Sequence, residues 1–359
     1  MNATRFLSFS RRDFLRFSAY AVLGLFLPPS GSLSLLKQTG TTFRDLNPDQ
    51  FGRVIYEQID VYDSPSFEGK RVGQYWLDTV LPVTDVTVGD EEPAFNRVWY
   101  QVNGVEYVHS GGIQPVKTVL NLPSPNVPAE GTWGEVTVPY TDALKDKGAY
   151  EPPAYRFYYE TIHWVLALEH DAFGAAWYRV LDDKFKTKNY YVPAEHMRLL
   201  SPAELTPISP HVDEKAKRIE VLTGRQVLIA YEEDQPVFMA RTASGASMRD
   251  GNYKTKPGRY SITGKRAGRH MAAGDITASG YDLPGVPWIC YITEDGIAIH
   301  GTYWHNNFGR PRSHGCVNVT PQAARWIYRW SYPIVPPEEQ ERFVTRGTPV
   351  DVIDDTEES

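Results

Sequence analysis

The stretch Ser313-His314-Gly315-Cys316-Val317-Asn318 decides how the C-terminal part of this chain is interpreted, and it follows the stretch Ile299-His300-Gly301-Thr302. A thiol is a competent nucleophile at neutral pH when a nearby base or positive dipole favours the thiolate, and either histidine is such a base. Gly315 permits a tight turn before the cysteine, and the backbone amides of Gly315 and Cys316 can then point at a developing oxyanion. The pattern therefore predicts that Cys316 is a catalytic nucleophile.

Cys290, the other cysteine of the chain, lies in the apolar run Val286-Pro287-Trp288-Ile289-Cys290-Tyr291-Ile292. A small thiol in such a run packs as an ordinary hydrophobic side chain. With two cysteines the chain has at most one internal disulfide, so disulfides do not hold this fold together. We expect Cys290 to be an inert core residue.

A zinc site is the main competing interpretation of the same stretch. Cys316, His314, His305 and His300 all have the chemistry of zinc ligands. The order His-x-Cys comes without a second ligating cysteine, however, which is untypical of zinc sites. We therefore expect neither a metal nor an organic cofactor.

The two motifs resemble the signature of the YkuD-type L,D-transpeptidases, together with Gly309 between them and the upstream strand pattern Pro-Gly-x-Tyr-x-Ile at residues 257–262. The resemblance covers residues 217–353 and implies a catalytic β domain with short helices. It also implies residue roles: Cys316 as nucleophile, His300 as general base oriented by the Gly301 carbonyl, His314 with the amides of Gly315 and Cys316 around the oxyanion, and Ser313 and Asn318 as braces of the loop.

The resemblance further implies a substrate, the peptidoglycan stem tetrapeptide that ends in D-alanine. Arg310 and Arg312 are candidates to bind a substrate carboxylate, with a solvated loop as the equally weighted alternative. Many members of the family have arginine where this chain has Asn318, so substrate contacts near the nucleophile differ from the family pattern. Three alternatives stay open: an L,D-carboxypeptidase that uses water, a cysteine endopeptidase of the wall, and a non-catalytic wall-binding protein.

Length and composition indicate more than one folded unit. The chain has 359 residues, and roughly 100 to 200 residues per domain predicts two or three domains. Abundant Trp, Tyr, Gly and Pro favour strands joined by turns, so we expect mainly β structure. The net charge is −7 and no basic run lies beyond the N-terminus, which argues against nucleic acid as a partner.

The N-terminus resembles a twin-arginine export signal, because Ser10-Arg11-Arg12-Asp13-Phe14-Leu15-Arg16 precedes the apolar stretch 17–27. We assign residues 1–30 to this signal and 31–47 to a flexible linker. We expect an exported protein of the cell wall, periplasm or extracellular face, whose membrane contact is the signal alone. No clear cleavage site follows, so cleavage and an uncleaved tether both stay open.

A weak internal repeat precedes the catalytic domain. The pattern Trp-Tyr-x-Val, then a turn and a Tyr-Val strand, occurs at Trp99 and again at Trp177. Short alternating strands at this spacing predict a small barrel in each copy, and both copies resemble bacterial SH3-like domains, at residues 48–122 and 130–202. Glycan binding by these domains is a further expectation, without assigned residues.

The remaining segments follow from local signals. A Pro-rich linker at 203–216 leads into the catalytic domain at 217–353, and an acidic tail occupies 354–359. Within the catalytic domain, residues 219–221, 226–231 and 237–242 are expected to form a meander. Residues 320–330 are expected to form a helix, with Thr320 as cap and Pro321 in the first turn.

Overall fold

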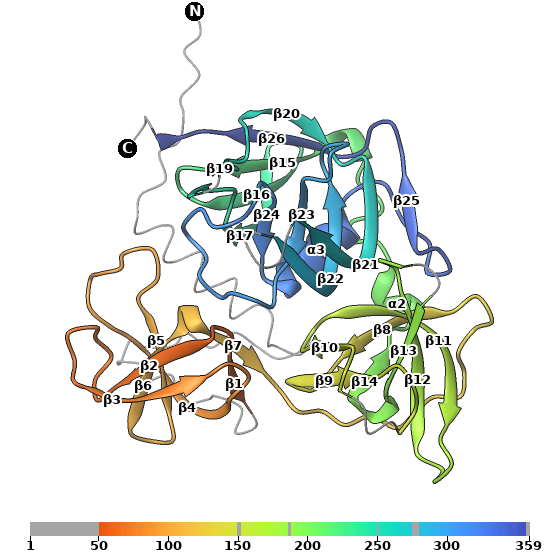
Figure 1. The fold of residues 1–359 in the computed structure, drawn as a ribbon. Helices are drawn as coiled ribbons and strands as arrows, with labels where there is room; N and C mark the ends of the chain where they lie inside the picture. The colour runs from red at the N-terminus through yellow and green to blue at the C-terminus, as the bar shows by residue number, and fades with distance from the viewer. Residues whose placement is uncertain (1–49, 149–151, 186–187, 250, 275–279, 357–359) are drawn as a thin grey trace, which may run out of the picture. The chain divides into compact units, whose positions relative to one another are not determined.

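The computed structural model describes residues 50–148, 152–185, 188–249, 251–274 and 280–356. The export signal and the linker predicted for 1–47 lie outside these residues. The described chain is mainly β, as the composition predicts, and its sheets form three successive groups of strands (Figure 1). Neither helix of the described residues has the length and apolarity needed to cross a bilayer.

The first β domain is a seven-stranded sheet in the order β3-β2-β6-β5-β4-β1-β7. Its strands are β1 (Phe51–Val54), β2 (Gln58–Tyr62), β3 (Arg71–Trp76), β4 (Val80–Val88), β5 (Val98–Val102), β6 (Glu106–His109) and β7 (Ile113–Val116), with a 3-10 turn at Ser110–Gly112 before the last. Alternating strand residues such as Val54, Val102 and Val108 are fully buried and form its core.

The second β domain has a five-stranded sheet, β13-β12-β11-β8-β14, and a separate pair, β10-β9. Its elements are β8 (Thr132–Val136), β9 (Tyr140–Ala143), β10 (Tyr155–Tyr158), β11 (Ile162–His170), β12 (Ala176–Asp182), β13 (Lys188–Pro193), a 3-10 turn (Ala194–His196), β14 (Met197–Leu199) and the short helix α2 (Pro202–Leu205).

The two domains repeat the same order of elements. In each, a first strand pairs with the fourth and the last, a hairpin follows the first strand, and a 3-10 turn precedes the last strand. The Trp-Tyr-x-Val segments are the equivalent strands β5 and β12, so the internal repeat is present in the structure. The SH3-like assignment itself stays a prediction.

The C-terminal part, which follows the second β domain, contains two five-stranded sheets. Its strands are β15 (Lys217–Leu222), β16 (Val227–Glu232), β17 (Gln235–Arg241), β18 (Ser247–Met248), β19 (Gly251–Asn252), β20 (Gly258–Ser261), β21 (Gly264–Ala273), β22 (Tyr281–Tyr291), β23 (Ala298–Gly301), β24 (Val317–Val319), β25 (Glu341–Phe343) and β26 (Pro349–Ile353). The orders are β17-β16-β15-β26-β20 and β24-β23-β22-β21-β25. The predicted meander is confirmed as β15, β16 and β17.

Helix α3 (Pro321–Trp330) is the predicted helix, and it packs on β22 and β23. The Thr320 hydroxyl accepts a hydrogen bond from the Ala323 amide at 3.2 Å, which is an N-cap. Its apolar face joins the main core, where Ile327 is fully buried and Cys290 is also buried, as expected of an inert thiol.

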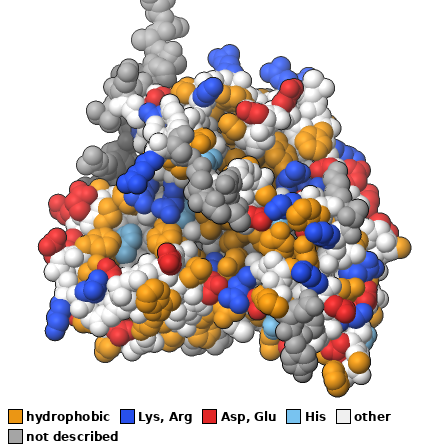
Figure 2. All heavy atoms as spheres, in the orientation of Figure 1, with side chains coloured by type: hydrophobic (Ala, Val, Ile, Leu, Met, Phe, Trp, Pro, Cys, Tyr) orange, Lys and Arg blue, Asp and Glu red, His pale blue; other side chains and the backbone are white. Residues whose placement is uncertain are grey.

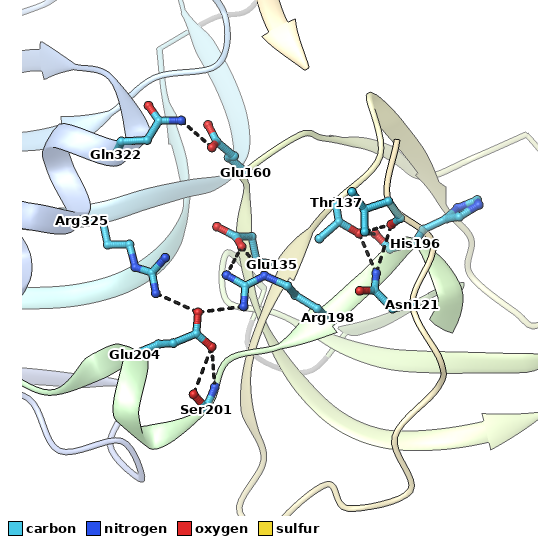
Figure 3. A network of polar contacts seen from close by, with 11 residues as sticks. Asn121, Glu135, Thr137, Glu160, His196, Arg198, Ser201, Glu204, Gln322 and Arg325 are labelled. Carbon is cyan, nitrogen blue, oxygen red and sulfur yellow. Dashed lines mark hydrogen bonds and ion pairs between the residues drawn. The ribbon is translucent and has the colours of Figure 1, made fainter. Parts of the chain in front are cut away.

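A polar network joins the second domain to α3 (Figure 3). Arg325 of the helix and Arg198 of β14 both contact the same oxygen of Glu204, at 2.9 and 2.8 Å. Gln322, one turn earlier in α3, donates to Glu160. These contacts fix one side of the helix that packs on β22 and β23.

Charged side chains of both signs are mixed over the visible face. Figure 2 shows Lys and Arg interspersed with Asp and Glu among the residues described, without one continuous basic surface on that face. The net charge of −7 agrees with this mixture.

Candidate active site

The site is built on two neighbouring parallel strands. The strands β23 and β24 run in the same direction, and in their register Ile299 pairs with Val317 and His300 pairs with Asn318. Cys316 directly precedes β24, and the Ala298 amide donates to its sulfur. Because Ile299 pairs with Val317, Cys316 lies next to the strand that carries His300. The strand that carries His300 runs from Ala298 to Gly301.

The turn before Cys316 is held by hydroxyl groups. The Ser313 hydroxyl accepts from the Gly315 amide at 3.1 Å and donates to the Cys316 carbonyl at 2.5 Å. Thr255 holds the Gly315 carbonyl from outside the motif, at 2.8 Å. Gly315 has a φ of +117°, a conformation that side-chain-bearing residues rarely adopt, so this turn requires glycine.

The amides of Gly315 and Cys316, which were both expected to face an oxyanion, differ in their hydrogen bonding. The Gly315 amide is occupied by Ser313, whereas the Cys316 amide has no hydrogen-bond acceptor among the described residues. Of the two, only the Cys316 amide is free to donate to a substrate oxygen in this arrangement.

The Cys316 thiol is half-buried, and its sulfur lies 4.0 Å from the Gly296 carbonyl oxygen. Burial raises the pKa of this thiol to about 11, against the hydrogen bond from the Ala298 amide, which lowers it. The thiol is therefore protonated at neutral pH and needs a base to become a nucleophile.

His300 is 2% exposed, and its Nδ1 lies 2.9 Å from the Gly301 carbonyl oxygen. Because a carbonyl only accepts hydrogen bonds, Nδ1 carries the proton and Nε2 has the free lone pair of a base. Burial lowers the pKa of His300 to about 4, although the bond to Gly301 acts in the opposite direction. The described contacts contain no hydrogen bond between His300 and the Cys316 sulfur, so substrate binding must close that distance if the two exchange a proton.

His314 is the exposed histidine of the motif. Its ring lies between two tyrosines, with ring centroids 4.6 Å from Tyr253 and 5.9 Å from Tyr281. Tyr281 begins β22, so a strand outside the motif contributes to the surroundings of the nucleophile. The sequence did not single out these tyrosines, because nothing in the local pattern indicates that they meet His314.

Asn318 does not face the substrate side. It is 2% exposed, and its side-chain nitrogen lies 3.0 Å from Nε2 of His305. Burial lowers the pKa of His305 to about 3, and the nearby Arg312 contributes in the same direction. A neutral His305 thus joins the loop 303–312 to β24, which is a bracing position rather than a contact position for Asn318.

Arg310 and Arg312 lie against the first β domain. The Arg310 guanidinium is 4.9 Å from the ring centre of Phe95, and that of Arg312 is 5.1 Å from the ring of Tyr56. Arg241 at the end of β17 donates to the Phe95 carbonyl and was not singled out from the sequence. None of these three arginines forms an ion pair with a carboxylate of the described residues, which is the condition expected of groups that bind a substrate carboxylate.

Zinc binding is the competing interpretation of these side chains. Within the ranges that the structure describes, no group of three or more His, Cys, Asp or Glu side chains is placed to hold a metal ion. His305 is directed to Asn318 instead of to the thiol.

Comparison with known proteins finds a family model that matches the C-terminal part of the chain. Residues 216–352 match the family model described as the L,D-transpeptidase catalytic domain, YkuD. No curated protein matches the chain.

Solved structures similar to this chain include three L,D-transpeptidases. One from Xylanimonas cellulosilytica has 23% identity and a TM-score of 0.28, covering 39% of this chain and 62% of that one. The catalytic domain from E. faecium has 21% identity and a TM-score of 0.30, covering 39% and 98%. L,D-transpeptidase 3 from Mycobacterium tuberculosis has 18% identity and a TM-score of 0.31, covering 39% and 61%. The first and third matches thus span less than two thirds of those chains.

Proposed function

We propose that this protein is a peptidoglycan L,D-transpeptidase with Cys316 as its nucleophile. The proposal rests on the match of residues 216–352 to the YkuD family model of the L,D-transpeptidase catalytic domain. The observation that carries the chemistry is the pairing of β23 with β24, which brings the half-buried thiol beside a histidine whose Nδ1 is held by the Gly301 carbonyl. That bond leaves Nε2 as the only basic atom of the ring.

In the first half-reaction, Cys316 attacks the carbonyl carbon that joins the L-centre of the diamino acid to the terminal D-alanine. Nε2 of His300 accepts the thiol proton as the sulfur–carbon bond forms. The carbonyl oxygen becomes an oxyanion, which the Cys316 amide and the nearby His314 stabilise. The tetrahedral intermediate collapses, the proton on Nε2 passes to the leaving amine, and D-alanine departs from a thioester.

In the second half-reaction, an amine from the side chain of another stem attacks the thioester carbonyl. His300 accepts a proton from this amine and returns it to the sulfur as the sulfur–carbon bond breaks. The product is a cross-link between two stems, and the thiol is regenerated. Water in place of the amine would give hydrolysis, which is the L,D-carboxypeptidase alternative.

The electrostatics favour proton transfer during attack over a preformed ion pair. With a thiol pKa of about 11 and an imidazole pKa of about 4, both groups are neutral at pH 7. A thiolate–imidazolium pair would need the opposite order of these values. No metal or organic cofactor has a part in this mechanism.

Substrate recognition is assigned to the arginines of the loop. Arg310 and Arg312, together with Arg241, present guanidinium groups that no described carboxylate neutralises. A forked donor of this kind pairs well with the free carboxylates of a stem peptide. Ser313 and Asn318 act behind them by fixing the loop.

The setting of the enzyme is proposed from the N-terminal sequence. The twin-arginine pattern at residues 10–16 supports export of the protein to the side of the membrane where peptidoglycan is found. The two SH3-like domains then precede the catalytic domain and are available for contact with the wall.

The decisive experiment is mass spectrometry of a defined disaccharide tetrapeptide after incubation with the full chain. D-alanine release with a dimeric product identifies transfer, and D-alanine release with a monomeric tripeptide identifies hydrolysis. Cleavage within the stem without D-alanine release would identify an endopeptidase.

Two cysteine variants test the assignment of the nucleophile. Cys316→Ala is expected to abolish D-alanine release and cross-linking while the protein stays folded, because it removes only the reacting sulfur. Cys290→Ala, the matched control in the core, should retain activity. Equal loss of activity in both folded variants would contradict this division of roles.

A further inference from the structure

A cavity of about 290 Å³ lies where the three β domains meet. We call it the junction pocket, and it is lined by Leu77 of the first domain, Tyr155 and Arg156 of the second, and Asp282, Pro284 and Trp304 of the catalytic part. Its volume is close to the lower end for small-ligand sites, which commonly occur at domain interfaces. The chemistry proposed at Cys316 does not require this cavity.

The walls of the junction pocket are held by one buried arginine. Arg53 of β1 is 2% exposed and pairs with Asp78 at 2.7 Å. The same guanidinium donates to the carbonyl of Tyr303, in the catalytic loop, at 2.9 Å. The other oxygen of Asp78 pairs with Arg156 of β10 at 2.9 Å. One network of ion pairs and a hydrogen bond therefore connects all three domains around the cavity.

The junction pocket adjoins the catalytic histidines. The ring of Trp304 lies 5.8 Å from that of His300, measured between centroids. On the other side, Asp282 directly follows Tyr281, whose ring is 5.9 Å from that of His314. A substrate bound at Cys316 is thus long enough to extend into the junction pocket.

The charges at the junction pocket neutralise one another. Each charged side chain has an opposite partner: Arg53 with Asp78 at 2.7 Å, Arg156 with Asp142 at 2.8 Å, and Asp282 with Lys184 at 2.8 Å. The arginines at 241, 310 and 312 lack such partners among the described carboxylates. A peptide carboxylate should therefore bind to those arginines, whereas the junction pocket is suited to an uncharged polar ligand.

The aromatic rings of the junction pocket further define the chemical class of its ligand. The ring of Tyr158 is already in contact with two groups: the Arg53 guanidinium lies 4.0 Å from its centroid, and the Tyr303 ring stacks with it at 5.2 Å. Tyr155 and Trp304 are half-buried and line the cavity. A sugar ring has an apolar face that packs on such rings, and it has hydroxyl groups that hydrogen-bond to Arg156 and Asp282.

We infer that the junction pocket is a saccharide subsite that holds an uncharged sugar ring next to the transpeptidase centre. On the proposed function, that ring belongs to the glycan strand from which the donor stem peptide extends. The assignment depends on the proposed function for the source of the sugar, but the binding itself does not depend on catalysis.

Direct binding tests the subsite independently of activity. Ligand-observed NMR is carried out with the full chain and an uncharged N-acetylglucosamine disaccharide. The wild-type protein and Tyr155→Phe, which keeps the ring, should bind it, and Tyr155→Ala should bind at least about tenfold more weakly. Phe173→Ala, which alters a 95% exposed ring outside the pocket, is the matched control and should bind like the wild type. Absence of binding by the folded wild type, or equal binding by Tyr155→Ala, would overturn the subsite.

Competition identifies the chemical class of the ligand. A sugar-free stem tetrapeptide should fail to displace the disaccharide, because the peptide lacks the ring that occupies the cavity. Displacement of the disaccharide by that tetrapeptide would show a peptide subsite and would overturn the assignment to sugar.

Kinetics then connect the subsite to the reaction. The wild type should have a lower KM for a disaccharide tetrapeptide donor than for the free tetrapeptide, and Tyr155→Ala should lose this preference. An equal rise of both KM values in Tyr155→Ala would indicate a general structural effect and contradict the subsite. If neither donor is turned over, the proposed function fails, while the NMR result still decides the subsite.

Discussion

At the scale of the residue, the thiol and its histidine are held in their uncharged forms. Burial raises the pKa of Cys316 and lowers that of His300, because both charged forms lose hydration. On the proposed function, the thiol becomes reactive when a substrate aligns it with Nε2 of His300. An uncharged thiol also resists oxidation, which acts on the thiolate.

The two histidines should behave differently when removed. His300→Ala is expected to lower the rate of acylation by about a hundredfold or more, the usual scale for a positioned general base. His314→Ala should lower the rate through a distorted turn and a weaker oxyanion site, and it should leave the pH dependence of thiol alkylation unchanged. The measurement is the pH profile of Cys316 alkylation in each variant and in the wild type.

The sign of the pH dependence follows from the two pKa values. Alkylation of the wild type should increase toward pH 11 as the thiol ionises, and enzyme turnover should fall only as the pH approaches 4, where His300 becomes protonated. If His314→Ala moves the alkylation profile and His300→Ala does not, the roles of the two histidines have been exchanged.

Local spacing accounts for what could be predicted at this scale. The contact of His300 with the Gly301 carbonyl joins adjacent residues and follows from the motif. The contact of Asn318 with His305 crosses a loop, and Arg241 approaches the site from β17, which lies far upstream in the sequence. A single sequence contains no spacing signal for such long-range contacts.

At the scale of the element, α3 was predictable because its signals are local. Thr320, Pro321 and the apolar positions Ala324, Ile327 and Tyr328 lie within one segment and match a helix start and face. The other end of α3 is stabilised from a distance: Lys265 of β21 donates to the Tyr328 and Ser331 carbonyls at 2.5 and 2.7 Å. A lysine on a distant strand gives no sequence signal of this role.

The cap of α3 should contribute measurably to stability. Thr320→Ala removes the oxygen that accepts from the Ala323 amide and should lower the free energy of unfolding by about 1 kcal/mol. Thr320→Ser keeps a hydroxyl at that position and should retain most of that stability. Urea denaturation of the two variants and the wild type measures both values, and an equal loss in Ser and Ala variants would exclude the cap as the cause.

At the scale of the whole molecule, the sequence indicated the repeat but not how its copies contact the catalytic part. The repeat shows in the recurring Trp-Tyr-x-Val strands, which are short and local. Contacts such as Arg53 with Tyr303 join residues separated by most of the chain, and an arginine on a short strand looks like a surface residue in the sequence. Its burial against Asp78 is a property of the assembled fold.

Export is a prediction about the molecule as a whole. Replacing Arg11 and Arg12 by lysine, at positions outside the described residues, should leave precursor in the cytoplasm, because a receptor for paired arginines reads the planar guanidinium as well as the charge. Cell fractionation measures the distribution. Replacing Lys37 by arginine is the matched control, and unchanged export of the double-lysine variant would rule out the twin-arginine route.

The network between the second domain and α3 contains two carboxyl groups with opposite pKa changes. Burial acts to raise the pKa of Glu204, but the Ser201 amide, Arg198 and Arg325 outweigh burial and lower this pKa to about 2. Burial raises the pKa of Glu160 to about 8, and the neighbouring Glu135 adds to this effect. Glu204 therefore stabilises the fold as a carboxylate, whereas Glu160 is favoured in its protonated form.

Glu160 should make the protein less stable as the pH rises. Between its ordinary pKa of 4.5 and its folded value of about 8, the folded chain binds a proton at Glu160 that the unfolded chain has released. Stability therefore falls with increasing pH across that interval. Glu160→Gln, which stays uncharged, should have a melting temperature similar to the wild type at pH 4.5 and higher by on the order of a few degrees at pH 8.5. Glu91→Gln, an exposed site outside the network, is the control.

Glu204 is the opposite case, because its contribution to the stability of the fold is present above pH 4.5 and is lost as the pH falls toward 2. Glu204→Gln should therefore destabilise the protein at pH 7 and destabilise it less at pH 3. Thermal melts of these variants across the pH range measure all three effects, and a Glu160→Gln difference that is constant with pH would show that this carboxyl group is not protonated in the folded protein.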